Sequence, residues 1–374
     1  VAKAVDAYNS SAGINFGNIK RKSEDTKGDI ILQLDSAAGE IVIGGYGDNE
    51  YRLKNPALII DPGGNDKYFV HNSLKGQVSI IIDHEGDDTY YSKENFSLGG
   101  ANFGVSILVD RKGDDSYRGN NFSQGCGAFG IGILMDGEGN DRYEGDTMVQ
   151  GAAAFGIGLL IDFKGSDRYT GALMAQGFGY TKGFGGIIDL KGDDEYSSGN
   201  RYPDFREPAK GFQCFSQGFG QGHRNYAGGG IGILADYAGD DTYQASYFAQ
   251  GASYWLSLGI LYDKEGHDDY HARRYAQGAG VHVSTGIMLD CSGNDRYSSW
   301  GVSQGCGYDF SQGMLVDMEG NDWYLSDWTS QGVGIGSGTG ILIDMGGDDS
   351  YQGQSNIQGY GLYDDLRDLG SLGL

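Results

Sequence analysis

The chain has 374 residues, with 68 glycines, 26 tyrosines and only four prolines, which excludes a collagen-like chain. Aromatic residues make up 12% of the chain, more than a disordered chain contains. The formal net charge of −24 argues against nucleic acid and anionic membrane surfaces as partners, and no run of 18 apolar residues indicates membrane insertion.

Residues 1–55 are predicted to form an N-terminal cap together with degenerate first copies of the repeat described below. Val1, Val5 and Tyr8 fit one face of a short helix, which would cover the end of a repetitive core. The chain starts with Val and not with Met, so we expect a mature protein whose signal peptide has been removed. The expected location is therefore extracellular, at the cell surface or periplasmic.

Eleven copies of the motif D-x-x-G-x-D-x-Y follow, and most successive copies are separated by 26 or 27 residues. The copies begin at Asp61, Asp83, Asp110, Asp136, Asp162, Asp189, Asp236, Asp263, Asp290, Asp317 and Asp344. Self-similarity at this period is typical of a solenoid, in which each copy forms one rung of a stack.

Each copy also contains a short apolar run that ends at its first aspartate, such as IGILMD at 131–136. These runs are rich in branched residues and bounded by glycine, which predicts strands, and nothing in the copy predicts a helix. We therefore predict an all-β fold, a single right-handed parallel β-helix (solenoid) of about 11–12 rungs, each of about 26–27 residues, with short end caps. The solenoid would span 56–360, and residues 361–374 would form the C-terminal cap.

Parallel stacking places equal positions of successive rungs above one another, about 4.8 Å apart. The tyrosines are predicted to stack ring on ring, either in the core or on an outer face suited to sugars. The glutamines of the Gln-Gly pairs are predicted to hydrogen-bond through their amides along the rod axis. These glutamines are Gln124, Gln150, Gln176, Gln217, Gln250, Gln277, Gln304, Gln331 and Gln358. Cys126 and Cys306 recur at one position, which predicts small buried side chains and no disulfide framework.

Stacked aspartates require neutralisation, because two carboxylates about 4.8 Å apart repel by about 3–4 kcal/mol at an effective dielectric constant of about 20. One solution is a hard cation held by carboxylates and turn carbonyls. The alternative is turn chemistry alone, in which the aspartates accept hydrogen bonds from turn amides or from a tyrosine hydroxyl of a neighbouring rung.

The segment G-N-D-x-Y resembles the second half of the calcium-binding nonapeptide of RTX proteins, with Gly139, Asn140 and Asp141 at G-x-D and Tyr143 at the apolar position. GGND at 63–66 and GGDD at 346–349 are further partial matches. The repeat differs from that family in three ways. Its period is 26–27 residues, most copies lack the double glycine, and an additional aspartate lies three residues before the glycine.

The resemblance implies Ca²⁺ held between rungs by turn carbonyls and by aspartates of neighbouring coils. Ser166 and His267 replace the middle residue of the turn in two copies, so the two outer aspartates are the predicted ligands. The predicted metal ligands are Asp83, Asp88, Asp110, Asp115, Asp136, Asp141, Asp162, Asp167, Asp189, Asp194, Asp236, Asp241, Asp263, Asp268, Asp290, Asp295, Asp317, Asp322, Asp344 and Asp349.

Apolar residues occupy three successive positions before most of the first aspartates, for example Ile133, Leu134 and Met135. Neighbouring residues of a strand point to opposite faces, so an apolar stripe is predicted on the outside of the rod. A large apolar patch on a soluble protein usually marks an interface, so we expect contact with a protein partner or a second copy of the chain.

The repeat is interrupted between Asp189 and Asp236, where 20 extra residues predict a loop at about 197–225 that projects from one corner. A second cluster of basic and aromatic residues contains His271, Arg274, Tyr275 and His282. Many parallel β-helices of this size are polysaccharide lyases or hydrolases, a resemblance of fold only. These four residues are therefore the catalytic candidates of an enzymatic alternative.

The sequence favours a secreted or cell-surface structural or binding solenoid, stabilised by Ca²⁺, that acts in surface assembly, adhesion or glycan contact. The alternative is a polysaccharide lyase or glycoside hydrolase on the same scaffold. No P-loop, HExxH or dinucleotide signature is present, so the sequence favours a protein that is not an enzyme.

Overall fold

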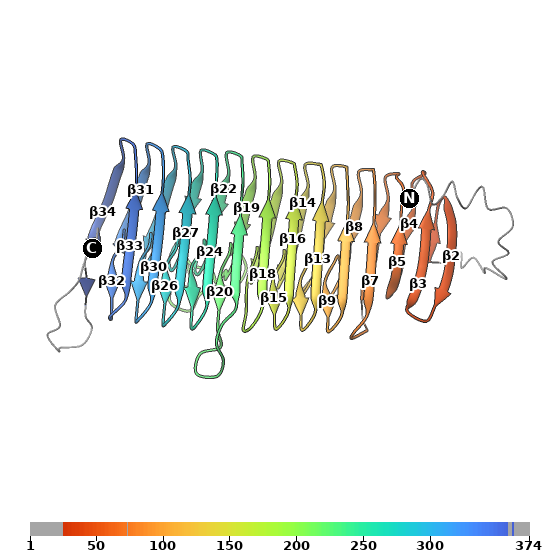
Figure 1. Ribbon diagram of the computed structural model, residues 1–374, viewed down its shortest axis with the longest axis horizontal. Helices are drawn as coiled ribbons and strands as arrows, with labels where there is room; N and C mark the ends of the chain where they lie inside the picture. Colours follow the sequence, from red (N-terminus) through yellow and green to blue (C-terminus); the bar gives the residue numbers. More distant parts are fainter. Residues whose placement is uncertain (1–24, 73, 358–360, 363–374) are drawn as a thin grey trace.

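The computed structural model describes residues 25–72, 74–357 and 361–362. These residues form a rod in which the strands of successive coils lie side by side along the long axis (Figure 1). Their regular structure is made of strands, and none of them forms a helix long and apolar enough to cross a membrane. The capping helix predicted around Tyr8, and all but two residues of the cap predicted at 361–374, lie outside the described residues.

Two 13-stranded sheets run along the rod, and two-residue strands form a third side. The sheet that contains the repeated tyrosines, here the tyrosine sheet, comprises β1 (Thr26–Lys27), β4 (Glu50–Tyr51), β6 (Lys67–Tyr68), β8 (Thr89–Tyr91), β11 (Ser116–Arg118), β14 (Arg142–Thr147), β17 (Arg168–Leu173), β19 (Glu195–Ser198), β22 (Thr242–Gln244), β25 (Asp269–His271), β28 (Arg296–Gly301), β31 (Trp323–Ser330) and β34 (Ser350–Ile357). The aliphatic sheet comprises β2 (Ile30–Ser36), β3 (Gly39–Gly44), β5 (Pro56–Ile60), β7 (Val78–Ile82), β10 (Val105–Val109), β13 (Ile131–Asp136), β16 (Ile157–Asp162), β18 (Phe184–Asp189), β21 (Ile231–Ala235), β24 (Leu258–Asp263), β27 (Thr285–Asp290), β30 (Gln312–Asp317) and β33 (Thr339–Asp344). The short strands are β9 (Ala101–Asn102), β12 (Gly127–Ala128), β15 (Ala153–Ala154), β20 (Gly220–Gln221), β23 (Ser253–Tyr254), β26 (Gly280–Val281), β29 (Gly307–Tyr308), β32 (Gly334–Ile335) and β35 (Gly361–Leu362).

One coil passes from an aliphatic strand through the D-x-x-G-x-D turn to a tyrosine strand, then through Gln-Gly to a short strand. Parallel pairing keeps equal positions in register, so that Tyr117 pairs with Tyr143 and Asp136 pairs with Asp162. The predicted right-handed parallel β-solenoid is thereby confirmed. It has about ten turns. The coils before β9 lack the short strand, which explains the short step of 22 residues between Asp61 and Asp83.

The N-terminal end of the described rod is closed by antiparallel strands, a feature that the repeat pattern does not predict. β2 pairs antiparallel with β3, and β1 pairs antiparallel with β4, whereas every later pair of the two large sheets is parallel. The antiparallel hairpin β2–β3 therefore covers the first parallel strand of the aliphatic sheet. Within the described residues, β2 is thus the terminal strand of the aliphatic sheet.

The core between the two large sheets consists of one tyrosine row and one aliphatic row. Tyr143, Tyr169, Leu134 and Leu160 are all fully buried, and their counterparts recur in successive coils. Adjacent tyrosine rings stack in parallel, with centroids 4.7 Å apart for Tyr143 and Tyr169. The repeated tyrosines from Tyr51 to Tyr324 are therefore core residues, and the alternative of an outer tyrosine face for sugars is wrong for them.

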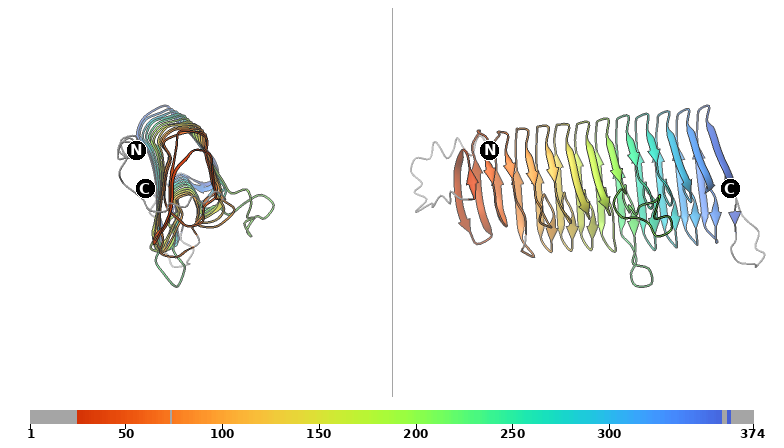
Figure 2. Two further views of the ribbon diagram at one scale, coloured as in Figure 1. Left: turned by 90° about the vertical axis from the view of Figure 1, so that its right-hand side faces the viewer. Right: turned by 180° about the vertical axis from the view of Figure 1, so that it is seen from behind.

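The interruption after Asp189 forms two loops at two corners, and not the single predicted loop. Tyr and Gln are 21 residues apart between Tyr196 and Gln217, but only seven apart in the preceding coil. The remaining extra residues form a small hairpin after β20, with a bridge between His223 and Ala227. Figure 2 shows the two green loops leaving the rod in different directions. The first loop is anchored by Glu207, which accepts hydrogen bonds from Arg273 Nε at 2.6 Å and from the Tyr247 hydroxyl at 2.8 Å.

Candidate metal centre

Two rows of aspartates line the inside of the turn that joins the aliphatic sheet to the tyrosine sheet. The first aspartate of each copy ends the aliphatic strand, and the second lies two residues before the tyrosine. Both rows are almost completely buried: Asp162 is 0% exposed and Asp167 is 3% exposed. Burial of so many carboxyl groups is unfavourable unless each is hydrogen-bonded and neutralised.

Six of the first aspartates accept one hydrogen bond from a tyrosine hydroxyl and one from a turn amide, as Asp162 illustrates. Its Oδ2 accepts a bond of 2.6 Å from the hydroxyl of Tyr143 in the preceding coil. Its Oδ1 accepts a bond of 3.0 Å from the backbone N–H of Lys164, two residues further along the turn. Burial raises the pKa of the Tyr143 phenol well above its usual value, so this hydroxyl remains a donor. These six first aspartates thus show the tyrosine-hydroxyl and turn-amide bonds expected from turn chemistry. In Asp136, Asp263, Asp290 and Asp317 the Oδ1 atom is buried and accepts no hydrogen bond.

The second aspartates receive one strong hydrogen bond and keep one oxygen without a partner. The backbone N–H of Asp115 donates to Oδ1 of Asp141 in the next coil at 2.6 Å, and the same bond recurs along the row. The other oxygen, Oδ2, is buried and accepts no hydrogen bond in nine second aspartates. These are Asp66, Asp88, Asp115, Asp141, Asp167, Asp194, Asp241, Asp295 and Asp322.

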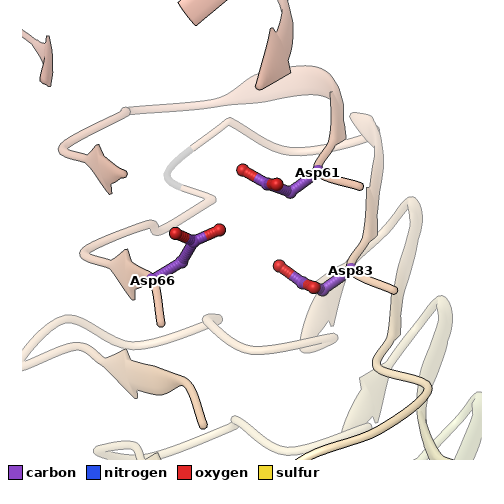
Figure 3. Close-up of side chains that lie close together, drawn as sticks. All are labelled: Asp61, Asp66 and Asp83. Atoms are coloured by element: carbon purple, nitrogen blue, oxygen red, sulfur yellow. The ribbon is translucent and has the colours of Figure 1, made fainter. Parts of the chain in front are cut away.

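The two rows come together in triads that each contain two first aspartates and the second aspartate between them. Figure 3 shows Asp61, Asp66 and Asp83 with their carboxyl groups turned toward one another. One oxygen from each of these three residues lies within 4.8 Å of the others. The same arrangement joins Asp136, Asp141 and Asp162, and further groups follow along the rod.

Burial raises the pKa of several aspartates in these triads well above the ordinary 3.8 when no cation is bound. The pKa is raised to about 8 for Asp88, about 9 for Asp167 and about 11 for Asp141. Desolvation is the largest cause in each case, and the negative charge of neighbouring aspartates adds to it. Either protons or cations must therefore neutralise the two rows.

The residues of the triads fit a hard divalent cation. The named triads consist of aspartate alone, so they offer oxygen ligands of the kind that Ca²⁺ prefers, without the His or Cys typical of zinc sites. The unpartnered Oδ2 atoms supply a lone pair in nearly every coil. Each coil also adds two buried carboxyl groups, whose charge one divalent cation would balance. The hydrogen bonds to the remaining oxygens would hold the carboxylates in place, as outer partners of metal ligands do.

The middle residues of the turns form a separate, exposed ladder outside the triads. The backbone N–H of Ser166 donates to Asn140 Oδ1 at 3.0 Å, and that of Asn294 donates to His267 Nδ1 at 2.9 Å. Any short side chain with an acceptor atom satisfies this contact, which explains why Ser166 and His267 are tolerated there. The structure thus separates the middle position from the candidate ligands.

All of the aspartates predicted from Asp83 onward belong to the two rows, and the structure extends the set at its N-terminal end. Asp61 and Asp66 form a triad with Asp83, although the predicted ligand set began at Asp83. The motif itself contains both residues, because GGND at 63–66 ends at Asp66. Asp344 and Asp349, in the last copy, are only half-buried.

The repeated glutamines stabilise the rod differently from the prediction. Nε2 of Gln150 donates to the backbone carbonyl of Tyr143 in its own coil at 2.9 Å and to that of Thr170 in the next coil at 3.0 Å. The predicted amide-to-amide ladder is therefore wrong, since seven glutamines from Gln124 to Gln304 each link two coils through backbone carbonyls. The cysteines are free, as predicted, and Cys126 and Cys306 are buried.

The four catalytic candidates lie on different parts of one coil. His271 is exposed on β25, with Nδ1 2.8 Å from Ser298 Oγ. Arg274 and Tyr275 follow in the segment before β26 and contact each other, with the guanidinium carbon 4.7 Å from the ring centroid. His282 lies beyond β26, where Nδ1 contacts a carboxylate oxygen of Asp309. The structure brings Arg274 and Tyr275 together and places the two histidines on either side of the short strand.

Comparison of this chain with protein-family models, with curated proteins and with solved structures found no match.

Proposed function

We propose that this protein is a secreted or cell-surface scaffold, a rigid rod stabilised by Ca²⁺, that acts in surface assembly, adhesion or glycan contact. The observation that carries the proposal is the pair of buried aspartate rows, in which nearly every coil keeps an unpartnered carboxylate oxygen. A cation in each triad would link two neighbouring coils and so stiffen the rod along its axis.

The chemistry of the rows supports an environment rich in calcium. Aspartates with raised pKa values release protons when a cation binds, so cation affinity is reduced at neutral pH. Calcium sites in extracellular modules have dissociation constants of about 10⁻⁴–10⁻³ M, which match calcium levels outside the cell. The net charge of −24 further favours cation uptake and keeps the rods soluble.

Thermal melting tests the proposal. We expect the melting temperature of the full chain to fall by about 10 °C or more after removal of cations with EDTA and to recover with Ca²⁺ but not with Na⁺ at equal ionic strength. Titration calorimetry should show several Ca²⁺ ions bound per chain. Melting temperatures that are equal in EDTA and in Ca²⁺ would contradict the proposal and leave protons as the neutralising charge.

A matched pair of variants locates the site. Asp141→Asn keeps an oxygen that can accept the Asp115 N–H, but it removes one charge from its triad with Asp136 and Asp162. We expect this variant to bind fewer Ca²⁺ ions and to gain less stability from Ca²⁺ than the wild type. Asn140→Ser changes the exposed neighbouring position to a residue that another copy already contains, and it should bind as many ions as the wild type.

A further inference from the structure

The outer side of the aliphatic sheet, here the aliphatic face, is an extended apolar surface. Along β13 the residues alternate strictly: Leu134 is fully buried, whereas Ile131 and the half-buried Ile133 and Met135 point outward. Parallel register aligns these outward positions from coil to coil, so that Ile107 pairs with Ile133 and Ile133 pairs with Leu159. The apolar stripe predicted from the sequence is therefore present in the described part of the rod.

The aliphatic face carries no charged side chain at any outward strand position from β7 to β33, although 21% of the chain is charged. Its polar outward residues are limited to the first positions of the last three strands, such as Thr285 and Gln312. The outer side of the tyrosine sheet differs, because ion pairs such as Arg118–Glu144 and Arg168–Glu195 cross between its coils. Of the two large sheets, only the aliphatic one thus keeps charged side chains off its outer side between β7 and β33.

Further apolar side chains extend the aliphatic face at the corner next to the short strands. Phe103, Phe129 and Phe155 stack in a row with centroids 4.7 Å apart, yet each ring is about half exposed: 52%, 49% and 43%. Further along the same corner, Val283 and Phe310 are exposed and line a shallow groove of about 440 Å³. Rings that stack on one another and remain open on their outer side leave a flat apolar edge.

We propose that the aliphatic face is the interface of a homodimer, in which two copies of the chain pack their aliphatic sheets against each other. Sheets pack face to face about 10 Å apart with strand directions within about 30° of each other, and an extended aliphatic sheet suits this arrangement. A two-fold axis would place the same patch on both copies, as in most homo-oligomers.

The area of the aliphatic face matches what a stable dimer needs. Ten coils about 4.8 Å apart extend over about 48 Å, and a six-residue strand spans about 20 Å. The product is about 950 Å² for each copy, or about 1,900 Å² for both. Specific protein interfaces bury about 1,200–2,000 Å², whereas the apolar patches that monomers expose are usually a few hundred Å².

The acidic character of the chain opposes association, and this gives the dimer a distinctive salt dependence. Two rods of net charge −24 repel each other, but the repelling groups lie off the aliphatic face and are screened beyond about 8 Å at physiological ionic strength. Added salt should therefore strengthen the dimer. An interface made of ion pairs would weaken under the same conditions, and an anionic membrane would repel the rod.

Sedimentation velocity of the full chain tests the inference. We expect a species of twice the chain mass of 40.0 kDa, whose fraction rises with protein concentration and with salt. Ile260→Lys places a charge at the centre of the aliphatic face and should raise the dissociation constant at least about tenfold, since a buried unpaired charge is unfavourable. Gln244→Lys, on the exposed side of the tyrosine sheet, adds the same charge and should leave the dimer unchanged.

A milder variant keeps the test valid if the lysine disturbs folding. Ile260→Thr retains a β-branched residue of a type that the aliphatic face already contains at Thr285, and it should weaken the dimer by a smaller factor while the β-sheet circular dichroism stays the same. A wild-type chain that stays monomeric at every concentration and salt level would overturn the inference. So would a monomer that binds zwitterionic lipid vesicles, because the face would then serve a lipid surface, or equal effects of Ile260→Lys and Gln244→Lys.

Discussion

Each buried tyrosine of the repeated row meets two requirements at once. Its ring fills the core by stacking on the tyrosines of the neighbouring coils, and its hydroxyl donates to a buried carboxylate, as Tyr169 does to Asp189 at 2.6 Å. Phenylalanine could provide the stacking but not the hydrogen bond. This double role explains why the position is tyrosine in every copy of the motif.

The tyrosine hydroxyl can be tested by its removal. Tyr169→Phe should lower the free energy of unfolding by about 1–3 kcal/mol, because the Oδ2 atom of Asp189 loses its donor inside the core. Chemical denaturation monitored by circular dichroism measures the change. The control is Tyr226→Phe, at a ring that is 84% exposed, which should have almost no effect. Equal stabilities of the two variants would show that the buried hydrogen bond contributes nothing.

At the scale of single elements, the turns are held together by glycine. Gly113 has φ of +144°, a region that L-residues rarely adopt, and a Cβ at this position would meet the carbonyl oxygen of Gly86 in the preceding coil at 1.5 Å. The close approach of successive turns therefore requires glycine at the fourth position of the motif. The turn brings the two aspartates of one copy to the same triad only because the backbone can pass this close.

We predict that Gly113→Ala destabilises the rod by about 2–4 kcal/mol, because neither the backbone angle nor the neighbouring coil can accommodate the methyl group. Gly346→Ala is the matched control in another copy, since its nearest contact would be an ordinary 3.9 Å to Met318. Thermal melting of the two variants measures the difference. A Gly113→Ala variant as stable as Gly346→Ala would contradict the assigned backbone conformation of this turn.

The stability of the whole molecule should depend on pH much more strongly without cations than with them. Folding raises the aspartate pKa from the ordinary 3.8 to about 8 for Asp268 and about 9 for Asp295. Without cations, the folded state therefore holds protons that the unfolded chain releases above about pH 4, and stability falls as the pH rises toward about 9. Within this window, each retained proton lowers the free energy of unfolding by roughly 1.4 kcal/mol for every unit by which the pH rises.

Melting curves recorded between about pH 5 and pH 9 test this dependence. In EDTA, the melting temperature should fall steadily as the pH increases. In saturating Ca²⁺ the fall should be much smaller or reversed, because the cation binds the deprotonated carboxylates. Parallel pH profiles in the two buffers would show that Ca²⁺ does not bind at the aspartate rows.

Much of the fold could be predicted from the sequence because every copy of the repeat contains the same strand, turn and core positions. The spacing of the eleven aspartate motifs predicts coils, the runs such as IGILMD predict strands, and parallel stacking places Asp136, Tyr143 and their counterparts in rows. The alternation in IGILMD also predicts an outward apolar stripe, which the structure contains. A pattern of period 27 leaves few other ways to bury these residues together.

The tertiary structure alone decided what depends on three-dimensional contacts between coils. It showed that Gln150 bonds to backbone carbonyls, that the interruption divides between two corners, and that an antiparallel hairpin closes one end. It also placed Asp61 and Asp66 with Asp83 and left one oxygen of the second aspartates without a partner. A sequence repeat specifies which residues recur at each level of the rod. Which atoms meet across neighbouring coils depends on backbone angles and side-chain directions, and these are set only when the coils pack.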